Sequence, residues 1–255
     1  MLSRGPRASY GPRMDLTSGP VLIDVEAIAG ELLAAVTAAP PRLDRAAFAI
    51  ARLGDRTIDD DRVIATLDAW GRRVADAARG SIPAGMDALE RLLVGELDLH
   101  GDDDEYDHPR NSYLPEVIAR RRGLPILLSV VWIEVARRAG LPLFGLALPG
   151  HFVVAYRAGE RGLVVIDPFR RGVILDRDEL EGLVARGGAT LSTALLAPAP
   201  AAGIAVRMLR NLVGSFQRRN LRDRVRAAAA LILALEPGDR GALEALALAG
   251  DDIDN

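Results

Sequence analysis

The 255 residues include 35 acidic and 32 basic side chains, which gives a net charge of −3. This near balance argues against a nucleic-acid partner, and the apolar runs are too short and interrupted to cross a bilayer. Because the chain contains no cysteine, disulfides, thiolate metal sites and thiol nucleophiles are excluded.

The first residues, MLSRGPRASYGPRMDLTSGP, are rich in glycine, proline, serine and arginine. This composition predicts a disordered N-terminus over residues 1–20, and Met14 is a second candidate for the start of the protein. The stretch lacks the apolar core of a secretory signal, so we expect a cytoplasmic protein.

A helical region is predicted over residues 21–98. Apolar residues recur at the spacing of one helix face in its second segment: Leu43, Ala46, Ala47 and Ile50. Further helices are expected over residues 60–79 and 85–97, with glycine and proline residues between them.

The middle of the chain combines an acidic loop with a buried helix. The run Asp102–Asp107 predicts a loop, after which Asn111 or Ser112 is expected to cap a short helix that ends at Arg121. Gly123-Leu124-Pro125 then interrupts the chain before ILLSVVWIEVARRAG, which is apolar almost all round at its start. Such a pattern predicts a helix whose N-terminal half is buried.

Strands follow directly, and helices return at the end. The segments LFGLAL, HFVVAY and GLVVIDPF are separated by turn residues, which predicts a short antiparallel sheet. LAPAPAAG is the best candidate for a linker. From about Ala205, two helical segments that end near Pro237 are expected to form an antiparallel pair.

Two of the strands carry a histidine and an aspartate. If a three-residue connection over 158–160 joins them, His151 lies opposite Asp167 on one face of the sheet. Opposed Cβ atoms are about 4.5–5.5 Å apart, which is close enough for the carboxylate to bond and orient the imidazole. The alternative is that His151 and Asp167 only serve the neighbouring turns, at Pro149-Gly150 and Pro168.

The segments PRNSYLPEVIARRRGLPILLSVVWIEVARRAGLPL, LPGHFVV and IDPF together resemble bacterial SirB-type transglutaminase-like proteins, from about Leu92 to Phe169. The resemblance implies an α+β fold with a helical N-terminal region, a papain/transglutaminase-like core with a short antiparallel sheet, and C-terminal tetratricopeptide-like helices. We place the helical region at residues 21–98, the core at 99–195 and the helical tail at 204–255.

The same resemblance implies that His151 and Asp167 correspond to the catalytic histidine and aspartate of active transglutaminases. Those enzymes carry a cysteine at the start of the central helix, where this chain reads Gly123-Leu124-Pro125-Ile126. Thiol-dependent transamidation or proteolysis is therefore excluded.

Four further residues are candidates for lining the cleft or binding a ligand: Arg110, Asn111, Ser112 and Pro125. Their alternative role is local, with Asn111 or Ser112 capping a helix and Arg110 pairing with the neighbouring acids.

Three functions remain open from the sequence. The favoured one is a non-catalytic or degenerate domain that binds a protein or peptide in a regulatory role, through its cleft or its C-terminal helices. The second is a hydrolase or acyltransferase that uses Ser129, His151 and Asp167, although a serine in an apolar helix more often bonds the carbonyl four residues earlier.

The third is a metal site built from His100, His108 and the acids Asp102, Asp103, Asp104, Glu105 and Asp107. Their spacing matches no metal-binding loop pattern, and acidic runs are usually solvated surface. We therefore expect no metal and no cofactor, and neither nucleic acid nor a membrane as partner.

Overall fold

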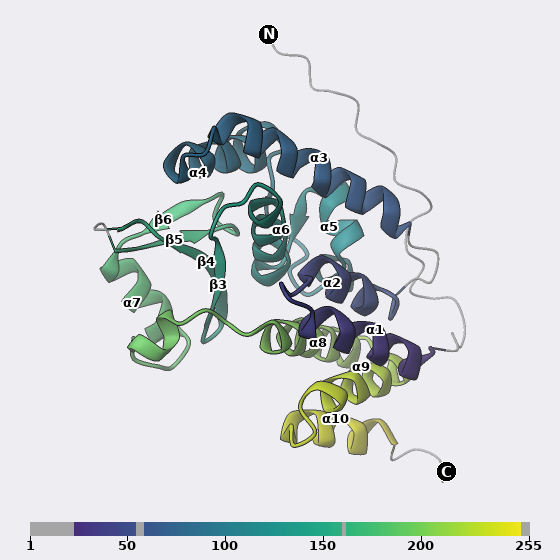
Figure 1. Cartoon of the computed structure of the whole chain (residues 1–255). Helices are drawn as coiled ribbons and strands as arrows, with labels where there is room; N and C mark the ends of the chain where they lie inside the picture. Colours follow the sequence, from purple (N-terminus) through teal and green to yellow (C-terminus); the bar gives the residue numbers. More distant parts are fainter. Residues whose placement is uncertain (1–22, 55–58, 160–161, 251–255) are drawn as a thin grey trace.

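The computed structural model describes residues 23–54, 59–159 and 162–250 (Figure 1). The predicted disordered segment 1–20 and Met14 lie outside these residues. The predicted α+β class is confirmed, because helices surround one four-stranded antiparallel sheet in the order β3-β4-β5-β6.

The N-terminal region is helical, as its periodicity predicts: α1 (Val25–Thr37), α2 (Leu43–Ala51), α3 (Asp60–Ala78) and α4 (Ile82–Glu90). The helix expected from residue 85 to 97 begins earlier, because Ser81 caps it by accepting from the backbone of Ala84. Pro83 fits in the first turn, where no backbone hydrogen bond is lost. The last part, η1 (Arg91–Glu96), is π-helical.

The next elements form the support of the central helix: β1 (His100–Gly101), the 3-10 helix η2 (Pro109–Ser112), α5 (Leu114–Arg120), β2 (Arg122–Gly123) and α6 (Pro125–Arg138). The prediction that Asn111 or Ser112 caps the short helix is wrong. Helix α5 begins after Tyr113, which makes no side-chain cap. The amide of Asn111 instead donates to the carbonyl of Glu105 at 2.6 Å.

The sheet contains β3 (Phe144–Leu148), β4 (His151–Arg157), β5 (Leu163–Asp167) and β6 (Val173–Leu175). The predicted register is wrong by two residues, since Arg157 pairs with Leu163 and Ala155 with Val165. The connection therefore covers residues 158–162 rather than 158–160. A shift of two residues preserves the alternation of side chains, so His151 and Asp167 still leave the sheet on one face.

Helices cover the sheet on both faces. Phe152, Val154 and Ile166 belong to the main hydrophobic core, which also includes α6. The alternate residues Val153 and Val165 pack in a second cluster with α7 (Arg177–Arg186). Neither β6 nor α7 is among the elements predicted from the sequence.

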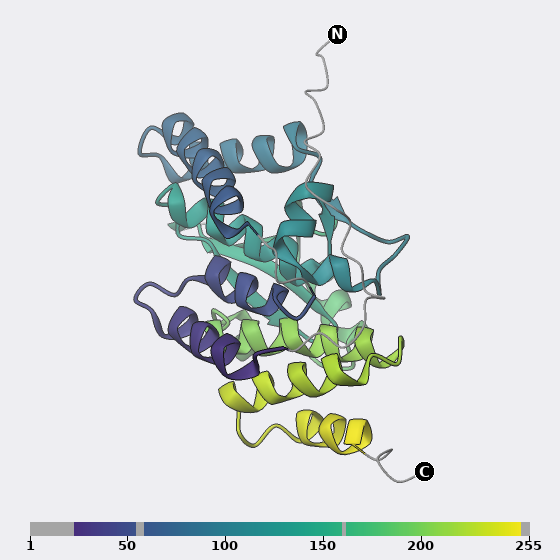
Figure 2. The ribbon, with the colours of Figure 1, turned by 90° about the vertical axis from the view of Figure 1, so that its right-hand side faces the viewer.

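The C-terminal helices are α8 (Ala201–Gln217), α9 (Arg222–Leu235) and α10 (Arg240–Gly250). Figure 2 shows α8 and α9 stacked beside α1 and α2, and the main core runs through all four helices. The segment predicted as a linker is tied to the sheet, because Ala199 donates its backbone N–H to the carbonyl of Gly145 at 2.9 Å. The division of the chain into three regions stays a prediction.

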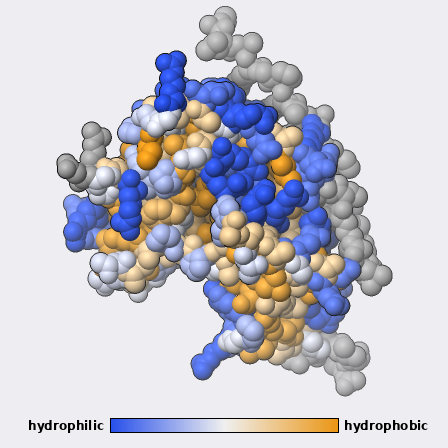
Figure 3. All heavy atoms as spheres, in the orientation of Figure 1, coloured by the Kyte–Doolittle hydropathy of each residue, from blue (hydrophilic) through white to orange (hydrophobic). Residues whose placement is uncertain are grey.

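The surface drawn in Figure 3 is hollowed between α7 and the C-terminal helices. Apolar side chains are visible over the C-terminal helices in this view, and in α10 Leu243 and Leu248 are 50% and 69% exposed. No helix within the described parts of the chain is both long and apolar enough to pass through a membrane.

Candidate functional site

The strand ends at one edge of the sheet bring the predicted histidine and aspartate together. His151 begins β4 directly after Gly150, whose φ of +72° favours glycine, and Asp167 ends β5. Nε2 of His151 lies 2.9 Å from Oδ2 of Asp167. The two residues are diagonal rather than opposed, yet their side chains form the hydrogen bond.

The Asp167 carboxylate is fully buried and bonded through both oxygens. Oδ1 accepts from the backbone of Phe169 at 3.0 Å, and Oδ2 also accepts from Nε of Arg170 at 2.9 Å. Burial favours the neutral form and is the largest influence, but the hydrogen bond and charge of His151, together with Arg170, outweigh it and lower the pKa of Asp167. Asp167 is therefore ionised at neutral pH.

An ionised carboxylate only accepts hydrogen bonds, so Nε2 of His151 carries the hydrogen. Nδ1 bonds to none of the described residues. The His151 side chain is 15% exposed, and its ring meets the ring of Phe169 edge to face, with centroids 6.1 Å apart. This arrangement can orient a base toward a bound molecule.

Phe169 connects the histidine to the start of the central helix. Its ring packs so closely on Gly101 that a Cβ there would lie 2.5 Å away from it. Gly101 pairs with Gly123 in the β1–β2 ladder, and Leu124 and Pro125 follow immediately at the start of α6. The resemblance places a cysteine at the start of α6. This chain has Leu124 and Pro125 there, and neither side chain carries a nucleophile.

Ser129 does not complete a triad in this structure. It is fully buried in α6, and its hydroxyl has no hydrogen-bond partner among the described residues. The expected bond to the carbonyl four residues earlier is also not formed. The structure brings together a base and the group that orients it, and it does not join Ser129 to them.

The cluster Arg110, Asn111 and Ser112 lies in the loop that supports α6. Arg110 pairs with Glu105, as the local alternative expects. Asn111 is fully buried, accepts from Arg120 at 2.7 Å, and its backbone carbonyl accepts from Leu124 at 3.1 Å. Asn111 thus holds the loop against the start of α6.

The acidic run is neutralised mainly by arginines. Asp102 is 2% exposed and pairs with Arg120, while Asp107 pairs with Arg218 at 2.5 Å. Within the described ranges there is no group of three or more histidine, cysteine or acidic side chains placed to hold a metal ion. This observation counts against the metal-site hypothesis.

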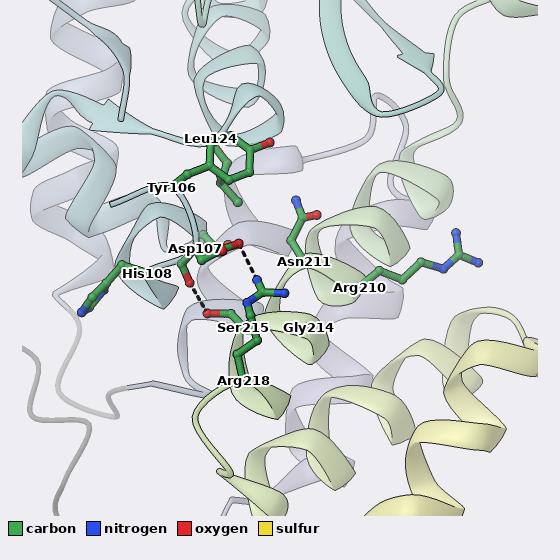
Figure 4. Close-up of a pocket in the computed structure, with 10 residues that line it drawn as sticks. Tyr106, Asp107, His108, Leu124, Arg210, Asn211, Gly214, Ser215 and Arg218 are labelled. Carbon is green, nitrogen blue, oxygen red and sulfur yellow. Dashed lines mark hydrogen bonds and ion pairs between the residues drawn. The ribbon is translucent and has the colours of Figure 1, made fainter. Parts of the chain in front are cut away.

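A pocket of about 140 Å³ lies where the C-terminal helix α8 meets the acidic loop (Figure 4). Residues from both sides line it, including Tyr106, Asp107, Ser112, Leu124, Asn211 and Ser215. Ser215 donates to the carbonyl of Asp107 at 2.6 Å. The rings of Tyr106 and Phe169 meet edge to face, with centroids 5.9 Å apart, so the pocket adjoins the Phe169 ring that packs on His151.

Only Ser112 among the predicted cleft residues lines this pocket. The contribution of α8 was missed because it comes from a segment about one hundred residues away, and no local sequence signal reports such a contact.

A buried helix that packs on an antiparallel sheet, together with a carboxylate-oriented histidine on that sheet, agrees with the transglutaminase-like class that the sequence resembles. Comparison supports this class, since a family model described as the Transglutaminase-like superfamily matches residues 61–210, which is more than half of the chain. The chain therefore belongs to the transglutaminase-like superfamily.

Relatives of this chain include proteins of bacteria and mammals. A UPF0162 protein of Xylella fastidiosa is 44% identical over 173 residues, which span 66% of this chain and 61% of that protein. A UPF0162 protein of Pseudomonas aeruginosa is 30% identical over 177 residues, or 68% and 64% of the two chains. The match thus spans less than two thirds of these relatives.

Human F-box only protein 21 is 29% identical over 143 residues, which are 53% of this chain and 22% of that protein. No solved structure matches the chain.

Proposed function

We propose that this chain is a degenerate transglutaminase-like domain of the SirB type that binds a protein or peptide in a regulatory role and performs no thiol chemistry. One observation carries the proposal. The His151–Asp167 pair has the geometry of an oriented base, but Leu124 and Pro125 stand at the start of α6, and the whole chain lacks cysteine.

Two features favour binding as the remaining use of the cleft. The matched region is a small part of human F-box only protein 21, which fits a module that works within a longer protein. The helices α8, α9 and α10 follow one another as antiparallel neighbours, as tetratricopeptide-like helices do. Too few to stand alone as a repeat array, α8 and α9 pack instead on α1, and α8 also on α2, while α10 packs on α9.

A serine-dependent hydrolase is the second candidate, and the unpartnered hydroxyl of Ser129 is the observation in its favour. Its complete burial counts against it, because a nucleophile must reach both its base and the substrate.

A fluorophosphonate probe separates the two candidates. The folded chain is exposed to the probe, its intact mass is measured, and circular dichroism confirms that the fold is kept. We expect no adduct. A stoichiometric adduct on Ser129 that disappears in the His151→Gln variant would favour the hydrolase and contradict the proposal.

A further inference from the structure

An arginine of α8 lies at the same end of the sheet as His151. Nη1 of Arg207 donates to the backbone carbonyl of Leu148 at 2.7 Å. Its guanidinium lies 5.7 Å from the centre of the Phe152 ring. Leu148 pairs with His151 across the β3–β4 hairpin, and Phe152 is the next residue of β4. Arg207 therefore lies beside the strand that carries His151.

Arg207 has no acidic partner among the described residues. By contrast, Arg210 pairs with Asp239, and Arg218 pairs with Asp107. The Arg207 guanidinium is partly buried, and burial lowers its pKa because no carboxylate compensates the charge. Its described partners are the Leu148 carbonyl and the Phe152 ring, and neither carries a negative charge that would balance the guanidinium.

The free side of this guanidinium is suited to one carboxylate. Nη1 is occupied by Leu148, which leaves Nε and Nη2 of Arg207 without a bond to a described residue. These two N–H groups lie on one edge of the planar group and match the two oxygens of a carboxylate.

Aromatic surface adjoins Arg207. Burial raises the pKa of Tyr106, and the positive charge of Arg207 opposes that rise, so the two side chains interact electrostatically. Tyr106 packs on Phe169, and Phe169 packs on His151. A ligand bound by the free edge of Arg207 would therefore have apolar ring surface beside it.

We propose that Arg207 binds a carboxylate of a peptide ligand that lies against Tyr106 and Phe169, beside His151. This inference rests on the proposed binding function and names the chemistry that the cleft recognises.

Nuclear magnetic resonance of arginine Nε–H groups tests the proposal directly. The ¹⁵N-labelled chain is titrated with three peptides: acetyl-Gly-Ala-Phe with a free carboxylate, the same peptide as its C-terminal amide, and acetyl-Gly-Glu-Phe amide. We expect at least one acidic peptide to bind about tenfold more tightly than the neutral amide, because only a carboxylate forms charge-assisted hydrogen bonds with both free N–H groups. The two acidic peptides distinguish a chain terminus from a glutamate side chain.

Three variants give the test its controls. Arg207→Gln is expected to lose the preference for the acidic peptides, and Arg207→Lys to keep part of it. Arg226→Gln, on α9 and outside the pocket, removes an arginine that already pairs with Asp223 and is expected to bind like the wild-type chain. Circular dichroism shows whether each variant is folded.

Equal affinity for the acidic and neutral peptides would overturn the inference, as would an unchanged preference in folded Arg207→Gln or no binding of any probe. Chemical conversion of a bound peptide that requires His151 would instead contradict the proposed function, while the affinities would still report on Arg207.

Discussion

At the scale of single residues, the Asp167 carboxylate determines how the His151 ring is oriented. It is fully buried, and its bonds to His151, Arg170 and the turn that follows it fix the orientation of the imidazole. Asp167→Asn keeps the shape but removes the charge. We expect it to lower the free energy of unfolding at pH 7 by about 2–4 kcal/mol, measured by urea denaturation.

The same residue predicts a pH dependence of stability. The pKa of Asp167 is lower in the folded chain than its ordinary value. Its contribution is therefore complete above the ordinary carboxyl pKa of about 4 and is lost as the pH falls through the lowered folded value.

Urea titrations at pH 7, 4 and 3 should show a smaller acid-induced loss of stability for Asp167→Asn than for the wild-type chain. Asp76→Asn, at an exposed position of α3, supplies the control. Equal losses in all three proteins would contradict this role of Asp167.

At the scale of elements, Arg138 joins three helices. It bonds Asp44 of α2 and Asp68 of α3, both at 2.6 Å, and Glu134 within α6 at 2.5 Å. Asp44 and Glu134 are almost completely buried, so removing the cation leaves their charge balanced only by the partly exposed Arg42 and Arg137. Arg138→Gln should lower the free energy of unfolding by about 3–5 kcal/mol in urea denaturation.

The exposed pair Arg73–Glu96 provides the matched control for that substitution. Arg73→Gln is expected to change stability by no more than about 0.5 kcal/mol. Similar effects of the two substitutions would contradict the importance assigned to the buried network.

The contact between β1 and the Phe169 ring predicts that two glycine substitutions differ in their effect on stability. A Cβ at Gly101 would overlap the Phe169 ring, whereas one at Gly238 would meet nothing within 4 Å. Gly101→Ala should therefore destabilise the chain by about 1–3 kcal/mol in urea denaturation, and Gly238→Ala should not. If both variants unfold at the same urea concentration, the close packing of Phe169 on β1 is not as described.

Much of this arrangement is predictable from the sequence because it depends on alternation and helical periodicity. The shared face of His151 and Asp167 survives an error in the loop length, since a shift of two residues preserves side-chain parity. The role of Asn111 was not predictable, because its amide bonds the loop instead of capping α5.

The contribution of α8 to the site could not be predicted from the sequence either. Arg207 and Ser215 meet the core through contacts between segments distant in the sequence, at Leu148 and Asp107, and no pattern in the intervening residues reports them.

At the scale of the whole molecule, one hydrophobic core joins the N-terminal, central and C-terminal helices. Its buried members come from α1, α6, α8 and α9, so the C-terminal helices cannot leave without exposing apolar surface. We expect a single cooperative unfolding transition.

The fluorescence of Trp70 and Trp132, which both pack in the main core, and far-UV circular dichroism should therefore give the same urea midpoint. Two separated transitions would instead support an independently folded C-terminal unit.

We propose that the His151–Asp167 site binds a ligand without performing chemistry. The most direct measurement is mass spectrometry of a peptide digest incubated with the chain and with methylamine as an acyl acceptor. We expect no hydrolysed or amidated peptide beyond the background of the His151→Gln variant. Products that accumulate with the wild-type chain and are absent with that variant would contradict it.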